Sequence, residues 1–129
     1  MKAEIVHKAL IPAMVENGGL EGTKEQWALA TLTSSCQMLK DQPEDDPYFS
    51  AAVYSLNSLF DSGAVVFEDN TITVKDFDLF FSQTKAKAQE VLALYQDASM
   101  NKTKAKAWIK RECEPNEAVQ KLNVFLKAK

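Results

Sequence analysis

The only histidine of the chain, His7, follows Glu4 in a Glu-x-x-His arrangement. In a helix this spacing places both side chains on one face, as in the metal sites of di-iron helical bundles. Such sites need a second Glu-x-x-His, and the sequence contains no second histidine. A surface or structural histidine is therefore the better interpretation of His7, and no metal ligand is predicted.

Other side chains that could do chemistry occur singly. Cys36 and Cys113 share no metal-ligand spacing, and both are predicted to be reduced, partly buried thiols. The sequence has no Cys-x-x-Cys motif and no glycine-rich phosphate loop, and a Ser-His-acid set would have to use His7. No catalytic residue is predicted.

The segment SLFDSGAVVFEDNTITVKDFDLFF, residues 58–81, could bind an ion or a nucleic acid. A calcium loop needs glycine at its sixth position, but a loop that starts at Asp61 has Val66 there, and one that starts at Asp69 has Val74. The order of helix and hairpin is also that of a winged helix. Residues 46–62 contain no lysine or arginine, so nucleic-acid binding through this helix is not expected. A winged-helix-like domain of this composition is expected to contact protein.

The composition is that of a soluble globular protein. At 129 residues, 46% hydrophobic and 26% charged, the chain fits one domain around a single core. No apolar run approaches the roughly 18–20 residues of a membrane-spanning helix. The N-terminal stretch carries Glu4, His7 and Lys8 among apolar residues, unlike a signal peptide. We expect a cytoplasmic protein with no membrane partner.

Charge is divided unevenly along the chain. Residues 1–100 hold 7 basic and 15 acidic side chains, a balance of −8, whereas residues 101–129 hold 8 basic and 3 acidic ones, a balance of +5. Apolar residues interrupt the lysines at helical spacing, which predicts two amphipathic helices docked on an acidic body. The candidate contacts to an acidic surface are Lys102, Lys104, Lys106, Lys110 and Arg111.

Capping and turn signals predict a mainly α fold of about six helices with one short β-hairpin packed between them, in a single domain over 1–129. The predicted helices cover about 2–16, 23–40, 46–61, 76–97, the stretch from Asn101, and the stretch from Glu114–Pro115 to near the C-terminus. The hairpin covers about 64–74 and turns at Asp69–Asn70. The predicted core faces include Trp27, Ala30, Leu32, Cys36 and Leu39, and also Phe49, Val53, Leu56 and Phe60.

Several stretches resemble the C-terminal part of the dipeptidyl peptidase III family of zinc metallopeptidases and its bacterial hydrolase relatives. MKAEIV, residues 1–6, resembles the second half of the family's Glu-Glu-Cys-Arg-Ala-Glu/Asp helix, and ALIPAMVENGGLEG, residues 9–22, is similar to the helix and loop that follow. AAVYSLNSLFDSGAVVFEDNTITVKDFDLFF, residues 51–81, resembles the family's long helix, hairpin and next helix, and residues 88–111 are similar to its closing stretch.

The resemblance implies a hydrolase module that lacks its own chemistry. The family's zinc-binding His-Glu-x-x-x-His and its third zinc ligand are absent from residues 1–129, and a family histidine falls at Tyr48. Glu4 matches a position next to the zinc site, so Glu4 and His7 are candidates for a supporting role behind metal ligands. The chain alone would bind no cofactor, and zinc would be present only if an upstream part supplies the ligands.

Two hypotheses of different class follow, and a third is nucleic-acid binding through the basic residues of 101–129, which a DNA affinity that does not change with salt would exclude. The first is a catalytically incomplete C-terminal module of such a hydrolase, with a structural or substrate-side role and the rest of that hydrolase chain as its partner. The second is a stand-alone, small α-helical, winged-helix-like domain that binds a protein partner. The second predicts an exposed apolar patch or an oligomer.

Overall fold

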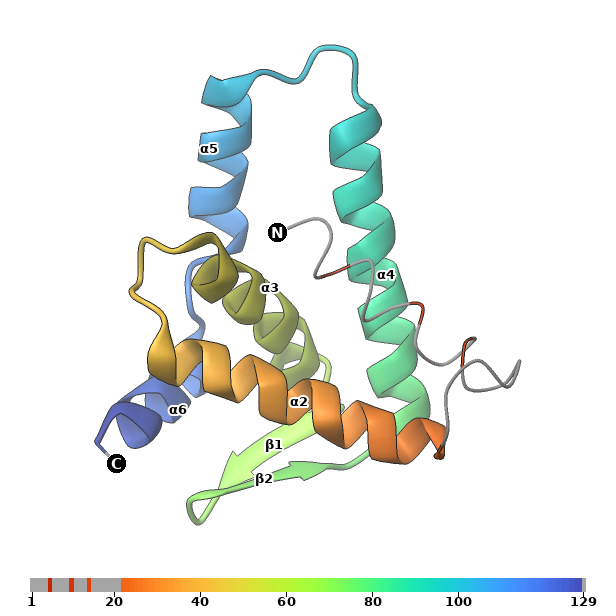
Figure 1. The fold of residues 1–129 in the computed structure, drawn as a ribbon, viewed down its shortest axis with the longest axis vertical. Coiled ribbons are helices and arrows are strands. Elements are labelled where there is room, and N and C mark those ends of the chain that lie inside the picture. Colours follow the sequence, from red (N-terminus) through yellow and green to blue (C-terminus); the bar gives the residue numbers. More distant parts are fainter. Residues whose placement is uncertain (1–4, 6–9, 11–13, 15–21, 129) are drawn as a thin grey trace.

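The computed structural model describes Ile5, Leu10, Met14 and residues 22–128. In this part of the chain five helices and a two-stranded hairpin follow one another (Figure 1): α2 (Lys24–Asp41), α3 (Pro47–Asp61), β1 (Val65–Glu68), β2 (Thr71–Val74), α4 (Phe77–Gln96), α5 (Lys102–Glu112) and α6 (Glu117–Lys127). The predicted mainly α fold with one hairpin is confirmed. Apart from the three single residues, the helix predicted over 2–16 lies outside the described residues.

Short polar side chains begin each helix, because each accepts a hydrogen bond from an otherwise unpaired first-turn N–H. Thr23 Oγ1 accepts from the Gln26 amide at 3.1 Å, and Gln26 Oε1 accepts from the Thr23 amide at 2.9 Å, which is the predicted capping box. The predicted start of the last helix at Glu114–Pro115 is wrong by two to three residues. The side chain of Asn116 accepts from the Val119 amide at 2.9 Å, so α6 begins at Glu117.

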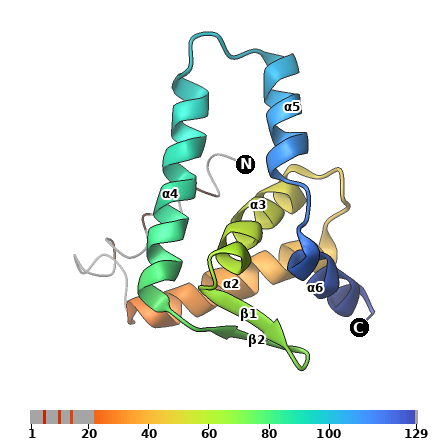
Figure 2. The same ribbon diagram turned by 180° about the vertical axis from the view of Figure 1, so that it is seen from behind.

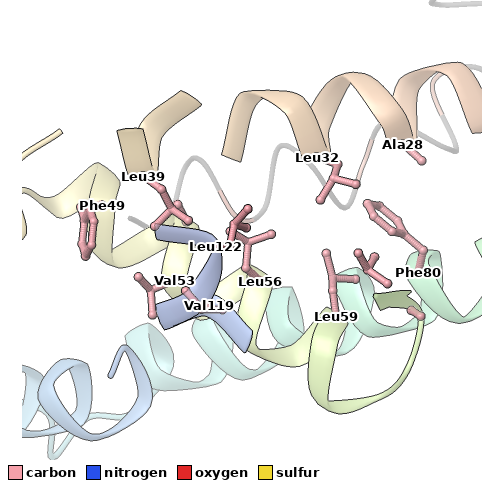
Figure 3. Packing of buried hydrophobic residues seen from close by; sticks show 13 residues of the cluster. Ala28, Leu32, Leu39, Phe49, Val53, Leu56, Leu59, Phe80, Val119 and Leu122 are labelled. Carbon is pink, nitrogen blue, oxygen red and sulfur yellow. The ribbon is translucent and has the colours of Figure 1, made fainter. Parts of the chain in front are cut away.

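Helix α3 is the centre of the fold. Its buried residues lie on most of its circumference (Phe49, Ala51, Ala52, Val53, Tyr54, Leu56, Ser58 and Leu59), as expected of a helix covered on several sides. It packs against α2, α4, α6 and β1. Figure 3 shows Val119 and Leu122 of α6 beside Val53 and Leu56 of α3, with Leu39 of α2 completing the layer.

Helix α2 covers α3 with a stripe of buried side chains, Ala28, Leu32, Ser35 and Leu39, at steps of four, three and four residues. The predicted face of this helix is correct at Leu32 and Leu39. It is wrong at Ala30, which is exposed, because the stripe that faces α3 runs through Ala28 instead.

The hairpin is joined to α3 by a short link that includes Gly63, at φ 82°. Asp69 and Asn70 have φ of 53° and 59°, the left-handed values that a two-residue hairpin turn requires. The strands pair antiparallel, with Phe67 opposite Ile72.

One hairpin face packs on the core. Val65 is buried, and Phe67, Ile72 and Val74 lie against the same cluster. The other face carries Thr71 and Thr73, which are exposed. In the described part of the chain the hairpin therefore packs on the helices through the face that carries Val65, Phe67, Ile72 and Val74.

Helix α4 begins beside the hairpin and packs along α3, and its C-terminal half and α5 extend away from the body at the opposite end (Figures 1 and 2). A second apolar cluster lies at their base, where Ile5, Tyr54, Ala88 and Val91 are buried and Trp108 packs against them. The rings of Tyr54 and Trp108 are 5.2 Å apart. Helix α5 has no fully buried residue.

Candidate functional site

The basic residues predicted as contacts lie on α5, at the end of the molecule opposite the hairpin (Figure 1). Lys102, Lys104, Lys106, Lys110 and Arg111 are all exposed. Lys104 Nζ donates to the Ser99 carbonyl at 3.2 Å, and Arg111 Nε lies 3.1 Å from Glu112 Oε1. They form the solvated outer surface of an amphipathic helix.

The other predicted site residues, Glu4 and His7, lie outside the described residues. Within the described ranges no group of three His, Cys, Asp or Glu side chains is placed to hold a metal ion. No helix in the same ranges is long and apolar enough to cross a bilayer.

The two cysteines are not joined by a disulfide. Burial, and next the negative charge of Glu112, raise the pKa of the Cys113 thiol to about 11 from an ordinary 9.0. The thiol is therefore protonated at neutral pH, whereas an activated nucleophile requires a lowered pKa. Burial and then Glu90 also raise the pKa of the neighbouring Tyr54 phenol above 10.0. This cluster favours neutral side chains, as a structural core does.

A groove of about 400 Å³ lies between α2, the hairpin and α6. Its apolar walls come from all three elements, as Leu29, Leu32, Phe67, Ile72, Leu122 and Phe125. We call it the α2–hairpin–α6 groove. Its volume is within the range of pockets that bind small ligands or single side chains, but it is open along one side and shaped by surface elements.

Each wall of the groove is held by the core beneath it. Leu32 and Leu122 belong to the main buried cluster. The Phe67 and Phe125 rings lie 5.6 Å apart, tilted by 50°, so the hairpin and α6 meet through an aromatic pair. The groove is therefore a preformed feature.

Leu29 projects from the groove into solvent. Its side chain is 48% exposed although it adjoins the buried stripe of α2. Single exposed leucines are ordinary, but this one borders a groove lined mostly by apolar side chains, with Thr33, Asn70 and Thr71 as its polar lining residues. A groove with mainly apolar walls and an exposed apolar side chain at its edge can receive an apolar side chain of a ligand.

The ends of the hairpin beside the groove are acidic. Residues 61–78 hold five acidic side chains and one basic one, Lys75. Glu68 and Asp69 at the turn are both exposed. They set a negative potential at one end of the groove.

An enclosed cavity between α2, α3 and α4 is much smaller. Its volume is about 20 Å³, with Ser35, Gln83 and Thr84 among its lining residues. This is room for about one water molecule. It is a packing defect in the core and offers no space for a substrate.

Sequence patterns did not point to the groove. Leu29 is separated from Ile72 and Leu122 by long stretches of chain, and only the tertiary fold brings the three together. The available signal was local: an apolar residue at position 29 adjoins the predicted stripe of its helix without being part of it.

Comparison of the chain with family models, with curated proteins and with solved structures finds no match.

Proposed function

We propose that this protein is an interaction domain that binds an apolar segment of a protein partner in the α2–hairpin–α6 groove, with basic residues of that segment beside Glu68 and Asp69. The observation that carries the proposal is the apolar groove with Leu29 exposed at its edge. An apolar surface with a charged rim is the usual composition of a protein contact site.

The position of α3 supports a protein partner over a nucleic acid. In a winged-helix protein that reads DNA, the helix before the hairpin enters the groove of the duplex. Here that helix is α3, and eight of its residues are buried beneath other elements. The acidic hairpin next to it would also repel a phosphate backbone.

Site-specific photocrosslinking tests the proposal. A photoreactive amino acid is placed at Leu29 and, as a matched control, at Val124, which is 72% exposed on α6 but does not line the groove. In the native host, position 29 is expected to give a discrete crosslinked protein that is absent from position 124. When Glu68→Gln and Asp69→Asn are added to this variant, the yield of the crosslinked protein should fall. Equal crosslinking at 29 and 124, or none at 29, contradicts the proposal.

The hydrolase module predicted from the resemblance stays a prediction. It is compatible with the interaction role, since the partner segment would then belong to the rest of the hydrolase chain. It predicts that the gene continues upstream of Met1 with an open reading frame that encodes a His-Glu-x-x-x-His motif. A stop codon directly upstream in the same frame would contradict it.

A further inference from the structure

The free edge of β2 adjoins the α2–hairpin–α6 groove. The turn and the first half of β2 line it through Asn70, Thr71 and Ile72. In the described part of the chain β2 belongs to a two-stranded sheet, in which it pairs with β1 and with no further strand. An unpaired strand edge is a template for another strand.

The register shows which backbone groups this edge presents. The Lys75 amide donates to the Ala64 carbonyl at 2.8 Å, and Val66 lies opposite Thr73. Hydrogen-bonded pairs alternate with unbonded ones in an antiparallel ladder. The N–H and C=O groups of Ile72 and Val74 therefore point away from β1, toward the open edge.

We infer that the partner segment binds in extended form as a third strand on β2, hydrogen-bonded to the backbone of Ile72 and Val74. This inference rests on the proposed function and specifies the conformation of the segment. Strand addition of this kind takes affinity from the backbone and specificity from alternate side chains.

The two faces of the hairpin set the pattern of the segment. Ile72 and Val74 are half-buried on the core face, whereas Thr71 and Thr73 are exposed. Alternate side chains of an added strand continue these two faces. One set is apolar and meets the groove beside Leu29, and the other set is polar and meets solvent.

Charge selects a basic partner over a second copy of this chain. Glu68 and Asp69 lie at the turn end of β2, and Asp76 and Asp78 lie beyond its other end, with Lys75 as the one basic residue between them. Pairing two copies along this edge opposes acidic side chains in either strand direction, which is destabilising. A lysine or arginine next to Glu68 and Asp69 would be attracted to both.

Backbone methylation of a probe peptide tests the hydrogen-bond pattern. The probe is a short acetylated peptide of two lysines followed by alternating valine and threonine, added to the full chain and followed by fluorescence anisotropy. One derivative carries N-methyl groups on the valines and the other on the threonines. An added strand bonds to its neighbour through alternate residues only. One derivative should therefore lose at least about tenfold in affinity, for two bonds of about 1 kcal/mol each, while the other binds within about threefold of the parent.

Amide hydrogen exchange locates the bound strand. Saturating unmethylated peptide is expected to slow exchange at Ile72 and Val74, whose amides point outward, and to leave the already bonded Thr73 amide nearly unchanged. Glu68→Gln with Asp69→Asn should weaken binding and its salt dependence. Asp97→Asn, which removes one negative charge from the exposed residue that follows α4, should change neither.

The outcomes separate the two proposals. Equal loss of affinity for both methylated peptides, absence of binding by the parent peptide, or a dimer of the free protein by light scattering overturns strand addition. If position 29 crosslinks to a partner but both methylated peptides lose the same affinity, the interaction role is kept and the extended conformation is overturned. Loss of the crosslink at position 29 overturns the interaction role itself.

Discussion

Replacing Asn57 with alanine is expected to loosen the attachment of α6 to α3. The Asn57 Nδ2 group donates to the Glu114 carbonyl at 2.8 Å, and its Oδ1 atom accepts from the Asn116 amide at 2.9 Å. One side chain thus serves two backbone groups directly before α6. A further hydrogen bond joins the same two segments, in which the Asn116 Nδ2 group donates to Asp61 Oδ1 at 2.8 Å.

The magnitude follows from the bonds that are lost. A typical protein hydrogen bond contributes about 1 kcal/mol net, and leaving a partly buried partner unpaired adds to the loss. Asn57→Ala removes two such bonds, so the free energy of unfolding should fall by about 2 kcal/mol. The exposed Gln89 on α4 provides a matched loss of an amide side chain, and Gln89→Ala should remain within about 0.5 kcal/mol of the parent.

Urea unfolding followed by circular dichroism measures the change. With a slope of about 1–3 kcal/mol per molar urea, the midpoint should fall by about 1 M at an unchanged slope. Hydrogen exchange should show the loss first at the Val119 amide, which Asn116 caps. A midpoint for Asn57→Ala equal to that of Gln89→Ala would refute the assignment of this contact as a clamp between the helices.

Three further changes probe other parts of the fold. Leu122→Ala, at a fully buried position of α6, should lower the free energy of unfolding by about 2–5 kcal/mol in urea titrations, while Val124→Ala should lie within about 0.5 kcal/mol of the parent. Asn70→Val should lower the melting temperature by an amount that corresponds to about 1–2 kcal/mol, because a β-branched residue is strained at φ 59°, whereas Asn70→Gly should not. Burial raises the pKa of the Cys113 thiol to about 11 from 9.0, so its contribution to stability is complete below pH 9 and is lost as the pH rises toward 11. Cys113→Ala should therefore lose less free energy of unfolding than the parent between pH 9 and pH 11. The same pH dependence of stability in the variant and the parent would contradict this assignment.

Local signals explain why most element boundaries could be predicted. A capping box involves residues three apart, and Thr23 and Gln26 form theirs without help from the rest of the chain. The turn at Asp69 and Asn70 likewise depends on two adjacent residues that tolerate positive φ. Interactions between residues this close in the sequence can be predicted without knowledge of the tertiary fold.

Faces and surfaces depend on distant segments, and there the sequence was less informative. Ala28 and Ala30 have the same side chain, and only the direction of α3 beneath α2 makes the first buried and the second exposed. Helix α6 begins at Glu117, later than predicted, because Asn57 and Asp61, more than fifty residues earlier, hold Asn116 in its capping position. The candidate groove is of the same kind, since its three walls meet only after folding.

The distribution of charge over the folded chain argues that its two exposed ends cannot serve the same ligand. The hairpin presents Glu68 and Asp69 beside a mainly apolar groove, whereas α5, which carries exposed lysines, lies at the opposite end of the molecule (Figure 2). A basic segment is attracted to the first surface and repelled by the second, and this favours one orientation of approach. Because salt ions screen the attraction between opposite charges, raising the ionic strength should reduce the rate at which such a segment associates more than it changes the rate of dissociation. An association rate that is insensitive to salt would mean that the acidic turn does not take part, and would leave the apolar walls of the groove and the backbone edge of β2 as the recognition surface.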